Sequence, residues 1–175
     1  GVEKINNSYE DDYSKVLPVF KSSNPSTATV SVSDMENAIL KGSKLIQSHS
    51  ITKRLKRRKT QNKAYLKFAK REEFNNWVDD AYILMGKAYF YQHNFMGAID
   101  NFGFLVRKYP KEETASEAQV WLIRCYTELE RFAEASEVIQ AIQADEKFPK
   151  KFEKDLAIAT ADYYIRQQEY SEATK

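Results

Sequence analysis

Residues suited to catalysis and metal binding are scarce in this chain. It has a single cysteine, Cys125, which rules out an internal disulfide, and only two histidines, His49 and His93, without a metal-ligand spacing. No glycine-rich phosphate-binding loop occurs, and the acidic residues follow helix faces without the pairing that acid–base catalysis needs. The sequence therefore predicts a protein that is not an enzyme and that binds neither a cofactor nor a metal.

Helix-breaking residues and long apolar runs are also few. The 175 residues include only 5 glycines and 4 prolines, and 42% are apolar with few β-branched runs, which favours an all-α fold. No apolar stretch approaches the roughly 18 residues that a membrane-spanning helix requires, so no segment is expected to cross a bilayer. Gly1 and the polar residues after it are typical of a fragment, so the missing signal sequence says nothing about the parent protein.

An internal repeat dominates the second half of the chain. A tyrosine and an alanine recur together at intervals of 37 and then 38 residues: Tyr89, Tyr126 and Tyr164, with Ala98, Ala135 and Ala173. Three copies at such a period are typical of stacked helical units that bury their apolar faces against their neighbours. In the first copy, Gly86 lets the second helix approach closely, and Pro110 ends the unit because proline cannot continue a helix.

The first copy follows a known pattern almost in full. It consists of Tyr82-x2-Met85-Gly86-x2-Tyr89, followed by Ala98, Phe102 and Pro110. This resembles the tetratricopeptide repeat, which has a small residue and an aromatic on its first helix and alanine, phenylalanine and a closing proline on its second. The resemblance implies antiparallel helical hairpins stacked as a right-handed α-solenoid, an architecture that serves as a binding scaffold.

The repeat array is expected to occupy residues 72–175. Its hairpins are predicted at about 77–110 and 115–143, and a longer connection is predicted over residues 144–152. A truncated third hairpin covers 153–175 and should stop one turn into its second helix, so the chain is expected to be part of a longer solenoid.

Residues 1–71 are predicted to form an N-terminal helical segment. A degenerate helix near 34–48 begins at a capping box, Ser33-x2-Glu36, in which the two side chains satisfy free backbone amides. Residues 21–33 are rich in serine, threonine, asparagine and proline, so they are expected to form a surface loop.

The insertion 52–71 carries ten basic residues and no acidic one. Its densest part, which we call the basic patch, has hardly any apolar residue to anchor it and is expected to be mobile: Lys53, Arg54, Lys56, Arg57, Arg58 and Lys59. Three interpretations remain open. The segment is a solvated loop, it contacts anionic lipid headgroups or an acidic protein, or it binds nucleic acid, which no recognition motif supports.

The inner helices of such an array line a groove in which one face of each helix should be exposed. Counting that face gives seven partner-binding positions: Asp80, Ile83, Lys87, Tyr91, Val120, Arg124 and Glu128. Two functions follow from different surfaces. The chain is an adaptor that binds a protein segment in the groove, or it binds an anionic surface or nucleic acid through residues 53–71. A salt titration separates them, because electrostatic binding weakens steeply with salt.

Further motifs resemble a narrower family. They are Tyr13-x-Lys-Val-Leu-Pro-Val-Phe20, Lys44-x2-Gln-x-His-Ser-Ile51, the basic insertion, the run from Trp77 to Phe90, and Phe102-x3-Val-Arg-Lys-Tyr-Pro110. Over roughly residues 9–175 the chain resembles the tetratricopeptide-repeat outer-membrane lipoproteins of Bacteroidetes, the PorW/SprE group of the type IX secretion and gliding apparatus. The resemblance implies a periplasm-facing lipoprotein, anchored by a lipidated cysteine that this chain lacks, that binds peptide segments or components of a secretion machine.

Overall fold

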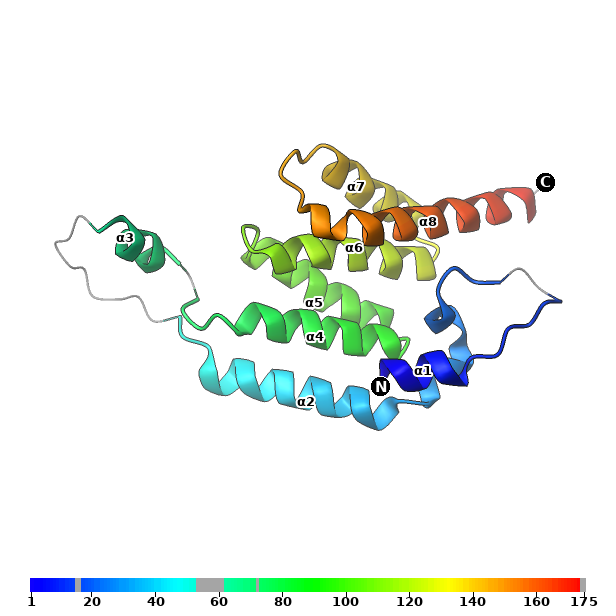
Figure 1. Ribbon diagram of the computed structural model, residues 1–175, viewed down its shortest axis with the longest axis horizontal. Helices are drawn as coiled ribbons and strands as arrows, with labels where there is room; N and C mark the ends of the chain where they lie inside the picture. The colour runs from blue at the N-terminus through cyan, green and yellow to red at the C-terminus, as the bar shows by residue number, and fades with distance from the viewer. Residues whose placement is uncertain (15–16, 53–61, 72, 174–175) are drawn as a thin grey trace.

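The computed structural model describes residues 1–14, 17–52, 62–71 and 73–173, and it describes residues 169–173 by their backbone alone. Over these ranges the secondary structure is helical and contains no β-strand, which confirms the all-α fold class (Figure 1). The helices are α1 (Val2–Ser8), α2 (Val32–His49), α3 (Lys63–Ala69), α4 (Val78–Tyr91), α5 (Phe95–Lys108), α6 (Glu113–Glu128), α7 (Phe132–Gln143) and α8 (Glu153–Ala173), with 3-10 turns η1 (Lys21–Ser23), η2 (Pro25–Thr29) and η3 (Lys150–Phe152).

Local chemistry explains where the helices of the repeat region begin and end. His93 and Glu130 adopt the left-handed conformation, with φ of 58° and 57°, in the turns that follow α4 and α6. Asn94 caps α5, because its side chain accepts a hydrogen bond from Gly97 N at 3.0 Å. α5 ends at Lys108, shortly before Pro110, and the connection between α7 and α8 over residues 144–152 has the length expected from the sequence.

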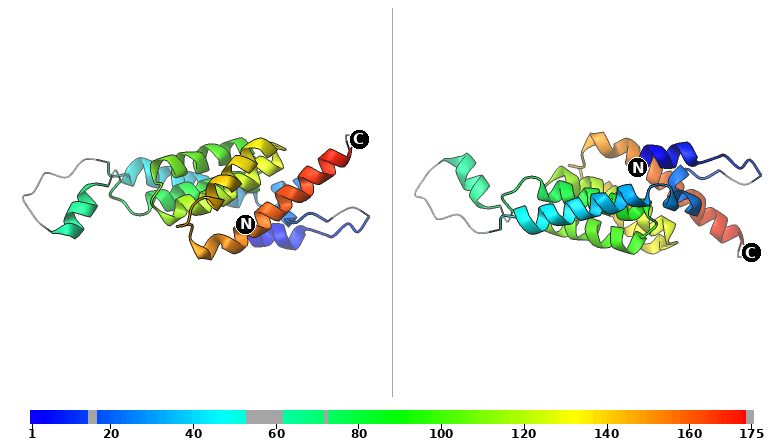
Figure 2. Two further views of the ribbon diagram at one scale, coloured as in Figure 1. Left: turned by 90° about the horizontal axis from the view of Figure 1, so that it is seen from above. Right: turned by 90° about the horizontal axis from the view of Figure 1, so that it is seen from below.

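Consecutive helices pack side by side to form the body of the molecule. α4 packs against α5, α5 against α6, and α6 against both α7 and α8, while α2 lies along another side of α4 (Figures 1 and 2). α4 and α6 run in the same direction, since Thr114 binds Asp79 near their first turns and Phe90 meets Trp121 further along. The C-terminal ends of α4 and α6 therefore lie close together.

Two clusters of buried side chains form the core of this body. The first joins α4, α5 and α6: Ile83, Phe90, Ala98, Phe102, Leu105, Ala115, Ala118, Leu122 and Cys125. The second joins α6, α7 and α8: Val120, Ile123, Ala135, Ile139, Ile142, Ala159 and Tyr163. The repeated alanines Ala98 and Ala135 are fully buried, as small residues between close helices should be, and Tyr126 packs against both clusters.

Two glycines set how closely the helices approach α4. A Cβ atom on Gly86 would lie 2.4 Å from Cε1 of Phe102, so the absent side chain is what admits this ring from α5. A Cβ on Gly42 of α2 would lie 2.6 Å from Cγ of Met85. Both sides of α4 therefore depend on a residue without a side chain.

The N-terminal part departs from expectation between residues 21 and 33. These residues lie largely at the surface, as predicted, but they form η1, η2 and the start of α2, and they bury Ser22 and Thr27, with exposures of 8% and 2%. Burial is possible because the hydroxyl groups bond locally, as Thr27 Oγ1 does to the Asn24 carbonyl at 2.7 Å. The predicted capping box is wrong, because α2 begins at Val32 and Ser31 occupies the N-cap position without a side-chain capping bond.

The third repeat copy does not contain the expected turn. α8 continues as one helix from Glu153 to Ala173, through the positions where a second helix of the hairpin was predicted to begin. Gln167, Gln168 and Glu169 are good helix formers, and no glycine, proline or asparagine interrupts them, so the local sequence favours continuation. The tyrosine–alanine spacing indicated a turn that these residues do not make.

The basic insertion contains a short helix, α3, which was not predicted. Phe68 at its end meets Phe74 edge-on, with ring centroids 5.2 Å apart. The basic patch, Lys53 to Lys59, and its predicted mobility lie outside the described residues.

Glu73 connects the end of α2 to the start of α4. Its buried carboxylate accepts hydrogen bonds from Ser50 Oγ, from Ile51 N at 2.7 Å, and from the backbone N–H groups of Phe74 and Asn75, both at 2.9 Å. Burial alone would raise the pKa of Glu73, but the hydrogen bonds from Ser50 and the backbone outweigh it and hold the pKa below its ordinary value of 4.5.

Replacement of Gly86 by alanine should destabilise the fold by about 1–3 kcal/mol, because the new methyl group overlaps the Phe102 ring. Gly103 on α5 offers a matched control. A Cβ there meets only the flexible Arg107 side chain at 3.2 Å, so Gly103→Ala should stabilise the helix by up to about 1 kcal/mol. Denaturant unfolding of both variants measures the difference, and equal effects would contradict the close-approach role of Gly86.

Glu73→Gln should lower the free energy of unfolding by about 1–3 kcal/mol at neutral pH, because the charged acceptor of several hydrogen bonds is lost. The lowered pKa gives the sign of the pH dependence. The contribution of Glu73 is fully present above pH 4.5 and is lost as the pH falls through the folded-state pKa. Urea unfolding of the native protein and the variant from pH 7 to pH 3 should therefore converge, whereas Glu137→Gln, on the exposed side of α7, should have little effect at any pH.

Candidate functional site

The chain's own residues 20–23 lie across the adjoining ends of α4 and α6. His93 Nε2 donates a hydrogen bond to the Ser22 carbonyl oxygen at 2.9 Å, and Ser23 Oγ donates one to Glu128. Arg124 Nη2 is 3.4 Å from Ser22 Oγ. We call the surface formed by His93, Arg124 and Glu128 the groove site. It holds a short piece of polypeptide by contacts between residues about 70 to 105 positions apart in the sequence.

Arg124 occupies the centre of the groove site between aromatic rings. Its guanidinium carbon lies 3.8 Å from the centroid of Phe20, 4.2 Å from that of Trp121 and 4.7 Å from that of Phe90. Phe90 and Trp121 come from the core, whereas Phe20 comes from the bound segment. Cations attract aromatic faces most strongly where water is excluded, so Arg124 is placed to bind an aromatic side chain.

A network of charges borders Arg124 on the α8 side. Arg166 of α8 donates to both carboxylate oxygens of Glu128, at 3.0 and 3.1 Å, and its Nε donates to Asp162 at 3.2 Å. These bonds attach α8 to the end of α6. Burial, which alone would lower the pKa of Arg166, is outweighed by Glu128 and Asp162, and the pKa is raised above its ordinary value.

Burial shifts the pKa values of Arg124 and Asp162 toward their uncharged forms. Burial lowers the pKa of Arg124, although neighbouring acidic groups including Glu128 and Asp162 counteract it. Burial likewise raises the pKa of Asp162 despite its bond to Arg166. The groove site is therefore poorly hydrated, which strengthens the electrostatic and hydrogen-bonding interactions made within it.

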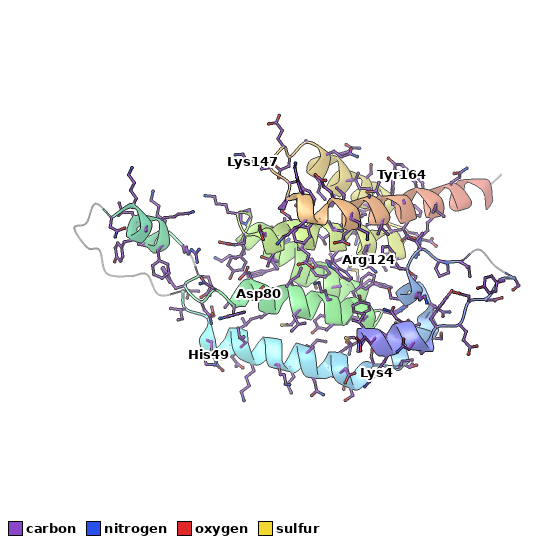
Figure 3. The ribbon with its side chains drawn as sticks, viewed as in Figure 1. Lys4, His49, Asp80, Arg124, Lys147 and Tyr164 are labelled. Carbon is purple, nitrogen blue, oxygen red and sulfur yellow. The ribbon has the colours of Figure 1, made fainter. Side chains whose placement is uncertain are left out.

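The structure brings together only some of the seven predicted groove positions. Tyr91, Arg124 and Glu128 lie at the groove site, and Lys87 lies beside it, 2.5 Å from Glu117 Oε1 and with its Nζ 5.5 Å from the Trp121 ring centroid. Asp80 is exposed near the other end of α4 (Figure 3). Partial desolvation of its carboxyl group, followed by the charges of Asp79 and Glu117, raises its pKa.

Two predicted groove positions are wrong, and the prediction for a third needs correction. Ile83 and Val120, with exposures of 6% and 4%, belong to the two core clusters and cannot meet a partner. Neighbouring helices cover the face that was counted as exposed. Arg124 was expected to be open in the groove, but its Nε atom is buried and Phe20 covers its guanidinium.

Sequence reasoning missed the groove-site residues that lie outside α4 and α6. Phe20 was assigned to a motif, Ser22 and Ser23 were assigned to a surface loop, and His93 was named only as a histidine without a metal-ligand spacing. Arg166 has one sequence signal, because it follows Asp162 by four residues and such pairs meet on a helix face. No local pattern indicates that residues 20–23 bind this surface.

Cys125 lies next to Arg124 in sequence but points into the core. Its side chain is fully buried, and burial strongly raises the pKa of its thiol. A buried thiol with a raised pKa is a poor nucleophile, so Cys125 acts as a small apolar residue of the core.

A second concave surface lies at the opposite end of the body, where α3 and the side chains of Lys70, Arg71 and Glu73 face the turn between α5 and α6. This basic cleft has a volume of about 590 Å³. Six basic residues line it: Lys67, Lys70, Arg71, Arg107, Lys108 and Lys111. Three of them come from the predicted basic insertion, and Arg107, Lys108 and Lys111 were not expected to join it.

Among the helices that the structure describes, none is both long enough and apolar enough to cross a membrane. In the same part of the chain, no three histidine, cysteine, aspartate or glutamate side chains come together as a possible metal site.

Comparison with known proteins leaves the family of this chain undetermined. No protein-family model matches it, and no curated protein sequence matches it significantly. The function of the groove site therefore has to be argued from its own contacts.

Phe20→Ala should loosen the segment over the groove site, because it removes the ring that covers Arg124. We expect a loss of about 1–2 kcal/mol in the free energy of unfolding and faster hydrogen exchange at the amides of Ser23 and Thr27, which bond within η1 and η2. Hydrogen exchange followed by mass spectrometry measures this. Val19→Ala changes an exposed neighbour and should leave exchange unaltered; equal protection in both variants would contradict the anchoring role of Phe20.

Proposed function

We propose that this chain is a non-enzymatic scaffold that binds short segments of other proteins at the groove site. One observation carries the proposal: the groove site already holds a short piece of polypeptide, residues 20–23, through a cation–aromatic contact and hydrogen bonds. Phe20 has an extended backbone, with φ of −114° and ψ of 123°, and the 3-10 turn η1 (Lys21–Ser23) follows it directly. A surface that accepts such a segment within the chain has the chemistry to accept one from a partner.

The proposal includes the finer architecture. Pairs of helices joined by short turns, α4 with α5 and α6 with α7, would be tetratricopeptide-like hairpins, and α4, α6 and α8 would be the inner helices of a right-handed solenoid. The packing of α4 on α6 and of α6 on α8 supports this arrangement. In such arrays the inner helices line the binding surface. The groove site lies on α6 and on the turn after α4, and Arg166 of α8 binds to its residue Glu128.

We further propose, from the sequence motifs, that the parent protein is a PorW/SprE-type lipoprotein of the type IX secretion and gliding apparatus. It would face the periplasm from the outer membrane and connect components of the machine. The support is the resemblance in residues 13–20, 44–51 and 77–110. Arrays of this kind use many weak contacts along a groove, which suits an adaptor between larger subunits.

A second candidate function is binding of an anionic surface or nucleic acid through residues 53–71. The basic cleft favours it, because residues of the insertion and of the α5–α6 turn line one concave surface with excess positive charge. Affinity there would fall steeply with rising salt. Of the residues that line the cleft, only Tyr109 is aromatic, whereas single-stranded nucleic acid stacks its successive bases on several rings, so anionic lipid or acidic protein is the better ligand class.

Photo-crosslinking in bacteria that make the protein tests the scaffold function. A benzophenone amino acid in place of Tyr91, beside the groove site, should yield covalent adducts with another protein on irradiation. The same group in place of Asp100, exposed on α5, is the matched control and should yield none. Adducts at both positions alike, or at position 100 alone, would contradict binding at the groove site.

A further inference from the structure

Arg124 is incompletely bonded by the segment that covers it. Its Nε atom is buried and has no hydrogen-bond partner among the described residues. Its contact with Ser22 Oγ, at 3.4 Å, is long for a hydrogen bond, and a guanidinium has further N–H groups to satisfy. The chain's own segment therefore supplies an aromatic ring to Arg124 but no negative charge.

The nearby carboxylates are engaged elsewhere. Glu128 accepts two hydrogen bonds from Arg166 and one from Ser23, and Asp162 accepts one from Arg166. Neither carboxylate bonds to Arg124, and the burial that lowers the pKa of Arg124 is consequently not offset by a direct ion pair. The groove site thus contains a half-buried cation, with its Nε atom fully buried, whose best partner is absent from residues 20–23.

We infer that the groove site binds a protein segment in which an aromatic residue is followed, two positions later, by aspartate or glutamate. This inference rests on the proposed scaffold function and specifies its partner. The partner would take the place of residues 20–23, with its aromatic ring where Phe20 lies and its carboxylate where the Ser22 hydroxyl lies.

Residues 20–23 of the chain already make the aromatic and backbone contacts that this ligand would make. The Phe20 ring stacks on the guanidinium at 3.8 Å, and His93 binds the carbonyl of residue 22, a group that every peptide has at that position. These contacts fix the direction and spacing of the bound segment. They do not select among side chains at the second position after the aromatic.

The requirement for aspartate or glutamate at the second position after the aromatic residue follows from distance and charge. Ser22 Oγ lies 3.4 Å from Arg124 Nη2, and an aspartate at the same place would extend one bond further toward the guanidinium. Arg–carboxylate hydrogen bonds are shorter and roughly twice as strong as neutral ones, and they are frequently bidentate. An acidic segment therefore gains an interaction that residues 20–23 cannot make.

A partner can displace residues 20–23 only if it gains an interaction that they lack, such as an ion pair with Arg124. Residues 20–23 belong to the same chain, so they compete at an effective concentration on the order of millimolar. A partner with the same contacts alone would bind weakly. The missing carboxylate makes residues 20–23 a replaceable cover, which selects for partners that carry negative charge at the right spacing.

Two labelled synthetic peptides test the inference. One has the sequence of residues 17–27, and the other is identical except for aspartate in place of Ser22. Fluorescence anisotropy measures their binding to the full chain carrying Phe20→Ala, which weakens the internal competitor. The acidic peptide should bind about tenfold or more tightly than the native-sequence peptide.

Arg124→Gln added to the Phe20→Ala chain should abolish the difference between the peptides, while circular dichroism verifies that the variant is folded. A chain that carries Ser22→Asp and keeps Phe20 should bind the acidic peptide more weakly than the native chain does, because its own segment now supplies the carboxylate. Equal affinity for the two peptides, a preference that survives Arg124→Gln, or no binding of either peptide would each overturn the inference.

These outcomes are separate from those that test the scaffold function. Adducts at position 91 with no preference for the acidic peptide would leave a scaffold whose ligand has other chemistry. A clear preference for the acidic peptide, without adducts at position 91 in cells, would support the inferred peptide site but contradict the scaffold function.

Discussion

The close contact between α4 and α5 at Gly86 is the constraint on which the rest of the arrangement depends. Because Gly86 has no side chain, the Phe102 ring lies against the α4 backbone. That ring stacks with the ring of Trp121, with their centroids 6.0 Å apart. The guanidinium carbon of Arg124 lies over the other ring, 4.2 Å from the Trp121 centroid. The spacing of α4 and α5 in the core therefore fixes the positions of the aromatic rings that contact Arg124 in the groove site.

The groove site combines a rigid base with a replaceable cover. Its base consists of core aromatic rings and the Glu128–Arg166 pair, which connects α6 to α8. Its cover is a segment with few apolar anchors, of which Phe20 is the one that touches Arg124. Local stability differs between such parts, because elements with little buried apolar surface open more readily than the core. This difference would serve the proposed scaffold function, since the base would stay ordered while its occupant exchanges.

Much of the helical framework could be predicted from the sequence. Apolar spacing and turn residues gave the helices from α4 to α7, and Gly86, Ala98 and Ala135 have the packing roles expected of small residues. Counting a helix face also identified Arg124 and Glu128. The same count failed for Ile83 and Val120, because helical periodicity gives only the direction of a side chain from its own axis. Which neighbouring helix covers that direction depends on packing between elements.

The sequence by itself determined the all-α class, the positions of the close helix contacts and the charge of the groove site, because these follow from local periodicity and residue type. Only the tertiary structure decided that neighbouring helices cover Ile83 and Val120 and that Phe20 covers Arg124. The second result joins residues more than 100 positions apart. The sequence of a serine-rich segment does not indicate which surface the segment packs against, because its hydroxyl groups bond equally well to water, to its own backbone or to Glu128. The fold selects among these by bringing the ends of α4 and α6 together.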